Sequence, residues 1–116
     1  MHTEILGANK ALQDIVAKSG YRYRLGEIVR TVSLATAVET EMIISPKQLN
    51  RVRRDARDLV IVVSVENRVI HAGQLQDFLM CSNKDIQNAR SRLTDASFAE
   101  KASAIWDTFH RVHAAR

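Results

Sequence analysis

Hydrophobic residues recur every three or four positions over most of this chain, which is the spacing of one buried face of an α-helix. Near the start these positions are Ile5, Ala8, Leu12, Ile15 and Val16. Gly20 follows and suits the position just beyond a helix end, so the pattern predicts a first helix over about residues 4–19. The same spacing continues from Leu25 to Ala35 and predicts a second helix over about residues 24–41.

Two capping boxes predict where further helices begin. In "SPKQ", residues 45–48, Ser45 suits the N-cap, Pro46 the first helical position and Gln48 the reciprocal contact, which predicts a short third helix. The second box is "SFAE", residues 97–100, and it opens a closing helix. The apolar stripe of that helix is Phe98, Ala102, Ile105, Trp106 and Phe109.

The segment "DARDLVIVVSVENRV", residues 55–69, is ambiguous because its β-branched run has strand propensity. Nothing else in the chain alternates convincingly, so a lone strand would leave its backbone groups unpaired. We therefore predict a buried helix, which also disfavours a winged helix, since that fold needs a β-hairpin. With aromatics at 5%, four Gly and one Pro, the 116 residues predict a single all-α domain, a bundle of about six to seven helices.

Other features of the chain predict a cytoplasmic setting. The single cysteine, Cys81, cannot form an internal disulfide, no secretory leader opens the chain, and the longest apolar run, residues 59–63, is far shorter than the ~20 residues of a membrane span. Cys81 is expected to be a small buried hydrophobic residue. His110 and His113 lie one turn apart without further ligands in sequence reach, so neither a metal nor another cofactor is expected.

Basic residues are concentrated between residues 45 and 57. The net charge of the chain is +4. The basic residues of this window are Lys47, Arg51, Arg53, Arg54 and Arg57. An even spread of the 17 basic residues would put roughly two in such a window. The concentration favours an acidic partner. A basic cluster taken on its own is explained equally well by a solvated junction between two helices.

The stretch "AGQLQDFLMCSNKDIQNARSRL", residues 72–93, matches the pattern of a helix-turn-helix unit. Such units bury a few fixed positions, because two short helices that meet at a steep angle share one small apolar seam. Here the residues at those positions are Leu75, Leu79, Cys81, Ile86 and Ala89. Two residues depart from the pattern, since Gln76 stands where a small residue is usual and Met80 where a turn glycine is common.

The outer face of the second helix is polar and suits base readout, because Asn and Gln amides pair with adenine edges and Lys with guanine. The predicted base-reading residues are Asn83, Lys84, Gln87, Asn88 and Ser91. The predicted phosphate-binding residues are Lys47, Arg51, Arg53, Arg54, Arg57 and Arg90. The alternative for the first set is a polar helix face that binds nothing.

From Ile28 to about Phe109 the chain resembles the C-terminal DNA-binding domain of the bacterial chromosomal replication initiator (DnaA) family, a Trp-repressor-like helix-turn-helix domain. Besides the helix-turn-helix pattern, the matching features are "I-V-x-x-V" at 28–32, "ISPKQL" at 44–49, "RRDAR" at 53–57 and "LTDASFAEKASAIWDTF" at 93–109. The resemblance implies a domain over residues 24–110 that follows an N-terminal helical extension, residues 1–23. It also implies double-stranded DNA as the partner, with the second unit helix in the major groove and the basic loop on the backbone.

The chain also departs from that family. "NKDIQNA", residues 83–89, replaces the family's Asp-His motif with its following Ser or Thr, Thr and Val, so recognition of the initiator's own binding sequence is not implied. There is no G-x-x-x-x-G-K-[ST] phosphate loop, and the chain is too short for an ATPase domain. We therefore expect a stand-alone, nucleoid-associated transcriptional regulator. The apolar stripe of residues 4–19 either covers the domain's own core or pairs with a second chain, and a homodimer through it is expected.

Two other classes of function have weaker support in the sequence. An enzyme is not expected, since acid pairs such as Asp55 with Asp58 lie among basic residues and no Ser-His-Asp or Cys-His order stands out. The main alternative to DNA binding is a small helical adaptor or antitoxin-like protein whose basic face meets an acidic protein. A steep salt dependence together with a sequence preference would distinguish DNA binding.

Overall fold

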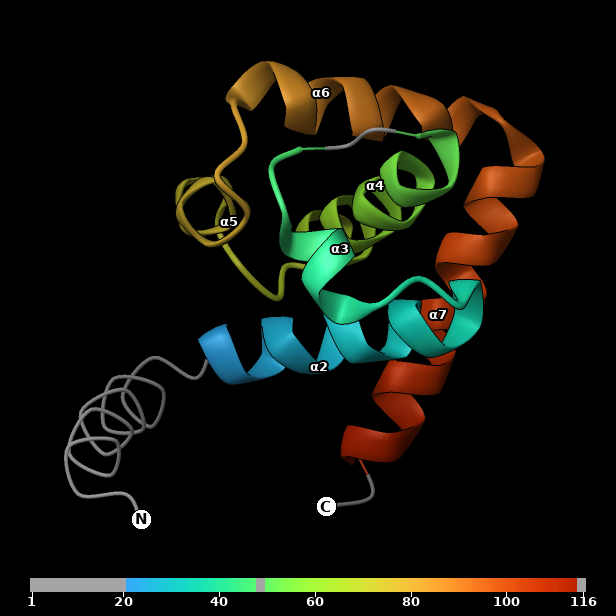
Figure 1. Ribbon diagram of the computed structural model, residues 1–116. Helices are drawn as coiled ribbons and strands as arrows, with labels where there is room; N and C mark the ends of the chain where they lie inside the picture. Colours follow the sequence, from blue (N-terminus) through green and yellow to red (C-terminus); the bar gives the residue numbers. More distant parts are fainter. Residues whose placement is uncertain (1–20, 48–49, 115–116) are drawn as a thin grey trace, which may run out of the picture.

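The structure, a computed structural model, describes residues 21–47 and 50–114 and is an all-helical bundle over that part of the chain (Figure 1). The α-helices are α2 (Tyr21–Thr36), α3 (Thr40–Ile44), α4 (Arg51–Glu66), α5 (Ala72–Leu79), α6 (Asn83–Ser91) and α7 (Ala96–Ala114), with a short 3-10 helix, η1 (Arg92–Thr94), before α7. The predicted all-α fold is confirmed. The helix predicted over residues 4–19 lies outside the described residues, as do Gln48 and Leu49.

Helix α4 lies at the centre of the bundle and is packed against α2, α6 and α7 (Figure 1). Every residue from Leu59 to Ser64 is buried, so this helix is surrounded on all sides. Apolar side chains of α2, such as Ile28, and of α7, such as Ile105, complete the core around it. The prediction of a buried helix from the β-branched run is confirmed, because burial on all sides outweighs a weak local strand propensity.

The second helix is shorter than predicted. Instead of one helix over residues 24–41, α2 ends at Thr36, Ala37 adopts a left-handed conformation with φ of 60°, and α3 begins at Thr40. An uninterrupted helix at about 100° per residue would turn Val38 away from the side that carries Leu25 and Ile28. The break lets Val38, which is 7% exposed, pack into the core with them.

The prediction of a short helix with Ser45 as its N-cap is wrong. Ser45 instead follows the end of α3 in an extended conformation, and its hydroxyl accepts a hydrogen bond from the Lys47 N–H at 3.2 Å. Helix α4 begins at Arg51, and the side chain of Asn50 caps it by accepting from the Arg53 N–H at 2.9 Å. The physical reason lies outside the segment, since the guanidinium of Arg57 in α4 holds the carbonyl groups of residues 43–45.

The closing helix is confirmed, but its start lies slightly before the predicted capping box. Helix α7 begins at Ala96, and the carboxylate of Asp95 accepts a hydrogen bond from the Ser97 N–H at 2.9 Å. Asp95 therefore occupies the capping position that was predicted for Ser97. Asp and Ser are both good N-cap residues, and the assigned end of a helix commonly varies by one or two residues.

Candidate nucleic-acid interface

Helices α5 and α6 are joined by a tight turn at residues 80–82. Met80 takes a left-handed conformation, with φ of 53° and ψ of 48°, and its N–H donates to the Gln76 carbonyl. The Cys81 N–H donates to the same carbonyl at 3.2 Å. The bond from Cys81 is the long bond of a Schellman motif and the bond from Met80 is that of the αL motif, and in both motifs glycine usually takes the left-handed position. Met80 therefore adopts the left-handed conformation that a glycine commonly adopts at this position of a helix-turn-helix unit.

The two helices share a small apolar contact. Of the five predicted seam residues, Leu75, Leu79, Ile86 and Ala89 are at most 1% exposed, and Cys81 is half-buried against the core. Burial raises the pKa of the Cys81 thiol, against the opposing effect of the nearby Arg57. Cys81 was predicted to be buried and is only half-buried, but the raised pKa of its thiol fits a poorly reactive residue.

The start of α6 is fixed by a capping box that is not one of the two predicted from the sequence. The Asp85 N–H donates to the Ser82 hydroxyl at 3.1 Å, and the Ser82 N–H donates to the Asp85 carboxylate at 2.9 Å. The sequence signal is "SNKD", residues 82–85, an acidic variant of the Ser-x-x-Glu pattern. At its other end α6 is tied to α4, since Arg90 Nε donates to the Glu66 carboxylate at 2.7 Å.

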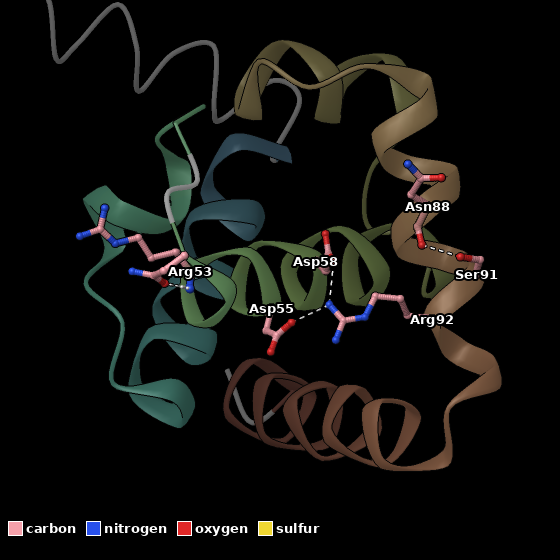
Figure 2. A network of polar contacts seen from close by, with 7 residues as sticks. Arg53, Asp55, Asp58, Asn88, Ser91 and Arg92 are labelled. Carbon is pink, nitrogen blue, oxygen red and sulfur yellow. Dashed lines mark hydrogen bonds and ion pairs between the residues drawn. The ribbon is translucent and has the colours of Figure 1, made fainter.

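The predicted base-reading residues lie together on one exposed face of α6. These residues are Asn83, Lys84, Gln87, Asn88 and Ser91, and all are exposed. At about 100° per residue they cover an arc of about 140°, which is opposite the buried Ile86 and Ala89. The Ser91 hydroxyl donates to the Asn88 carbonyl at 2.7 Å (Figure 2). The side-chain amides of this face carry both donors and acceptors, as base edges do.

The predicted phosphate-binding residues are only partly brought together. Lys47, Arg51 and Arg54 are exposed, and Arg53 is half-buried, in the segment that leads into α4. Figure 2 shows Arg53 in the first turn of α4, at the left of the view, whereas Asn88 and Ser91 of α6 lie at the right. A single duplex that contacts both groups would therefore have to reach from the start of α4 to the outer face of α6.

Arg57 is not an accessible phosphate ligand, and that prediction is wrong. Its side chain is buried, with 7% of the residue exposed. One guanidinium nitrogen donates to the carbonyls of Ile43, Ile44 and Ser45 at 3.0, 3.2 and 3.1 Å. The other terminal nitrogen donates to the Leu79 carbonyl at the end of α5.

The bonds of Arg57 explain its burial. Carbonyl groups at helix C-termini have no partner within the helix and carry partial negative charge, so a guanidinium is a suitable ligand for them. Burial lowers the pKa of Arg57, but a guanidinium remains charged in proteins. Arg57 therefore fixes the end of α3 to the end of α5 and so positions the helix pair that carries the polar face.

The acidic pair Asp55 and Asp58 belongs to a salt-bridge cluster on α4. Arg92 of η1 lies 2.8 Å from a carboxylate oxygen of each (Figure 2), and its guanidinium also lies 4.3 Å from the centre of the Phe98 ring. Burial raises the pKa of Asp58, and the hydrogen bond from Arg92 opposes that effect. This arrangement ties the end of α6 to α4 and positions α7.

No group of three His, Cys, Asp or Glu side chains among the described residues is placed to hold a metal ion. The His110 ring stacks on Trp106 with 5.4 Å between ring centres. None of the helices described here has the length and hydropathy needed to cross a membrane.

Comparison with known proteins adds no further information. No known family, no curated protein and no solved structure matches the chain. The resemblance to the replication initiator's DNA-binding domain therefore rests on the sequence features quoted above.

Proposed function

We propose that this protein binds double-stranded DNA with sequence preference and acts as a stand-alone transcriptional regulator. The observation that carries the proposal is the exposed polar face of α6, held by a buried seam on one side and by a capping box at its start. A helix fixed in this way can enter the major groove, which is about 12 Å wide, without losing its contacts to the bundle.

Within this proposal, the roles of the α6 residues follow from their chemistry. The amides of Gln87 and Asn88 are suited to adenine, and the ammonium group of Lys84 is suited to guanine. Asn83 and Lys84 lie in the first turn of α6, the part of a reading helix that commonly contacts base edges. Ser91 lies one turn beyond Gln87 and accepts or donates with its hydroxyl.

Phosphate contacts would come from the exposed basic side chains. Lys47, Arg51, Arg53 and Arg54 supply four charges beside the start of α4. Arg90 would be a fifth contact, in which a phosphate competes with Glu66 for its guanidinium. Five contacts correspond to a slope of about −4 to −5 for log K against log salt concentration.

The experiment is fluorescence anisotropy of genomic duplex fragments with the full chain at several salt concentrations. The proposal expects one or a few fragments to bind more tightly than random duplex, with that slope. Failure to retain any fragment at ~50 mM salt would refute it. Equal binding to every duplex and to unrelated polyanions would instead favour an adaptor that meets an acidic protein.

Substitutions can distinguish the side chains that bind the DNA backbone from those that read the bases. Arg53→Ala with Arg54→Ala should weaken binding to all duplexes alike and flatten the salt slope. Gln87→Ala or Asn88→Ala should cost about 1–3 kcal/mol on the preferred sequence alone. Arg111→Ala is the matched control, because Arg111 is an exposed arginine on α7 outside the proposed interface. If both classes of change lowered specific and random binding equally, α6 would not be the base reader.

A further inference from the structure

A groove with a volume of about 1000 Å³ runs between α2 and α7, with the start of α4 at its base. The described residues include five large apolar side chains that are exposed, and three of them line this groove. These three are Leu34, Val52 and Val112, which are 81%, 60% and 48% exposed. Isolated exposed apolar residues are ordinary, but a cluster around one groove indicates a surface that is covered by something.

The charges around the groove are nearly balanced. The basic residues that line it are Arg30, Arg51, Arg92 and Lys101, and the acidic residues are Glu27, Asp55 and Asp95, a formal sum of +1. Several of these charges neutralise one another, as Arg92 does with Asp55. A groove of this kind does not favour a polyanion, and it suits an apolar helix whose own charges are also balanced.

We propose that this groove is covered by residues 4–19 of the same chain, folded back along α2 as a helix. The sequence of that segment has an apolar stripe and balanced charges, with Glu4 and Asp14 against Lys10 and Lys18. The inference concerns the fold of the chain and does not depend on DNA binding.

The position of the groove relative to the start of α2 supports this occupant. Helix α2 begins at Tyr21, directly after the segment, and the groove-lining residues of α2 include Glu27, Thr31 and Leu34. These residues are spaced along one face of the helix. A segment that turns back at Ser19 and Gly20 would run antiparallel to α2 over this face, with Ile5 close to Leu34.

The lengths also agree. A helix over residues 4–19 would be about 24 Å long, which is also the length of the 16-residue α2, and the groove-lining part of α2, from Glu27 to Thr36, would be covered by the first half of the segment. The stripe of the segment could pair with a second chain instead, which is the homodimer expected from the sequence. A directly connected segment has an effective concentration in the millimolar range, so it occupies the groove ahead of a second molecule.

Disulfide trapping on the full chain tests both the occupant and its origin. A Cys81→Ser background carries Ile5→Cys with Leu34→Cys, and the matched control carries Lys10→Cys, on the opposite side of the segment, with Leu34→Cys. We expect the first pair to form a disulfide within one chain under mild oxidation, and the control to form it about tenfold more slowly. A covalent dimer as the main product, or equal rates for the two pairs, would overturn the proposal.

Hydrogen exchange measured by mass spectrometry gives a second test without new cysteines. Amides of residues 4–19 should exchange at least about tenfold more slowly than unstructured chain, and Leu34→Asp should abolish that protection. Met80→Asp is the control, because Met80 is 65% exposed and lies outside the groove. Exchange of residues 4–19 at the rate of unstructured chain in the unchanged protein, or equal effects of the two substitutions, would overturn the proposal.

Discussion

Replacement of Arg57 by methionine should destabilise the protein far more than the same change at Arg54. The guanidinium of Arg57 donates to four backbone carbonyls, and the bonds to Ile43 and Leu79 are buried. Methionine fills similar volume but has no donor, so two buried carbonyls lose their partners at about 1–3 kcal/mol each. The carbonyls of Ile44 and Ser45 are partly buried, and water can replace the lost bonds there.

Part of this loss is offset. Burying a guanidinium is itself costly, and methionine removes that cost. The expected net effect of Arg57→Met is therefore a loss of about 2–4 kcal/mol in the free energy of unfolding. The matched change Arg54→Met, at an exposed position three residues earlier in α4, should cost about 0.5 kcal/mol or less. Arg57→Lys should be intermediate, because an ammonium group cannot reach all four carbonyls with the geometry of the planar guanidinium.

Urea unfolding followed by circular dichroism and by the fluorescence of Trp106, the single tryptophan, measures these differences. The two arginines should also differ in the opposite order in DNA binding. Under conditions where each variant is folded, Arg54→Met should weaken binding to random duplex directly, and Arg57→Met should act only by displacing the α5–α6 pair. Equal stability of Arg57→Met and Arg54→Met would refute the structural role of Arg57.

Three further predictions concern single side chains. Met80→Gly should stabilise the protein by about 0.5–1 kcal/mol in urea unfolding, because Met80 is 65% exposed and holds a φ of 53° that glycine adopts without strain; a loss of stability would contradict this. Ser64→Ala should raise the stability by about 1 kcal/mol, since the hydroxyl of Ser64 is fully buried without a hydrogen-bond partner among the described residues; a lower unfolding midpoint would argue for an unseen partner. Because burial raises the pKa of Cys81, its thiolate fraction at pH 8 is smaller than that of an unstructured cysteine peptide, and iodoacetamide should modify it more slowly; equal rates would refute the assignment.

Much of the fold could be predicted from the sequence because helical periodicity is a local property. Helix α4 was predicted because a lone strand would leave its backbone groups unpaired, whereas the spacing of apolar residues located α7 and the apolar seam of α5 and α6. The exposed face of α6 was predicted for the same reason, since the residues that are buried in a short helix determine which residues point outward. Even the unusual conformation of Met80 had a sequence signal, because it occupies the position where a turn glycine is common.

Other features depend on groups that are distant in the sequence. Arg54 and Arg57 are the same residue type in the same helix, yet Arg57 is buried because residues 43–45 and Leu79 direct unpaired carbonyls at it. The break at Ala37 likewise reflects the fit of Val38 into a core supplied by other helices. The groove between α2 and α7, and the separation of Arg53 on α4 from Asn88 on α6, follow from how whole helices pack. Local spacing determines which face of a helix is apolar, but only the tertiary structure decides which groups that face meets.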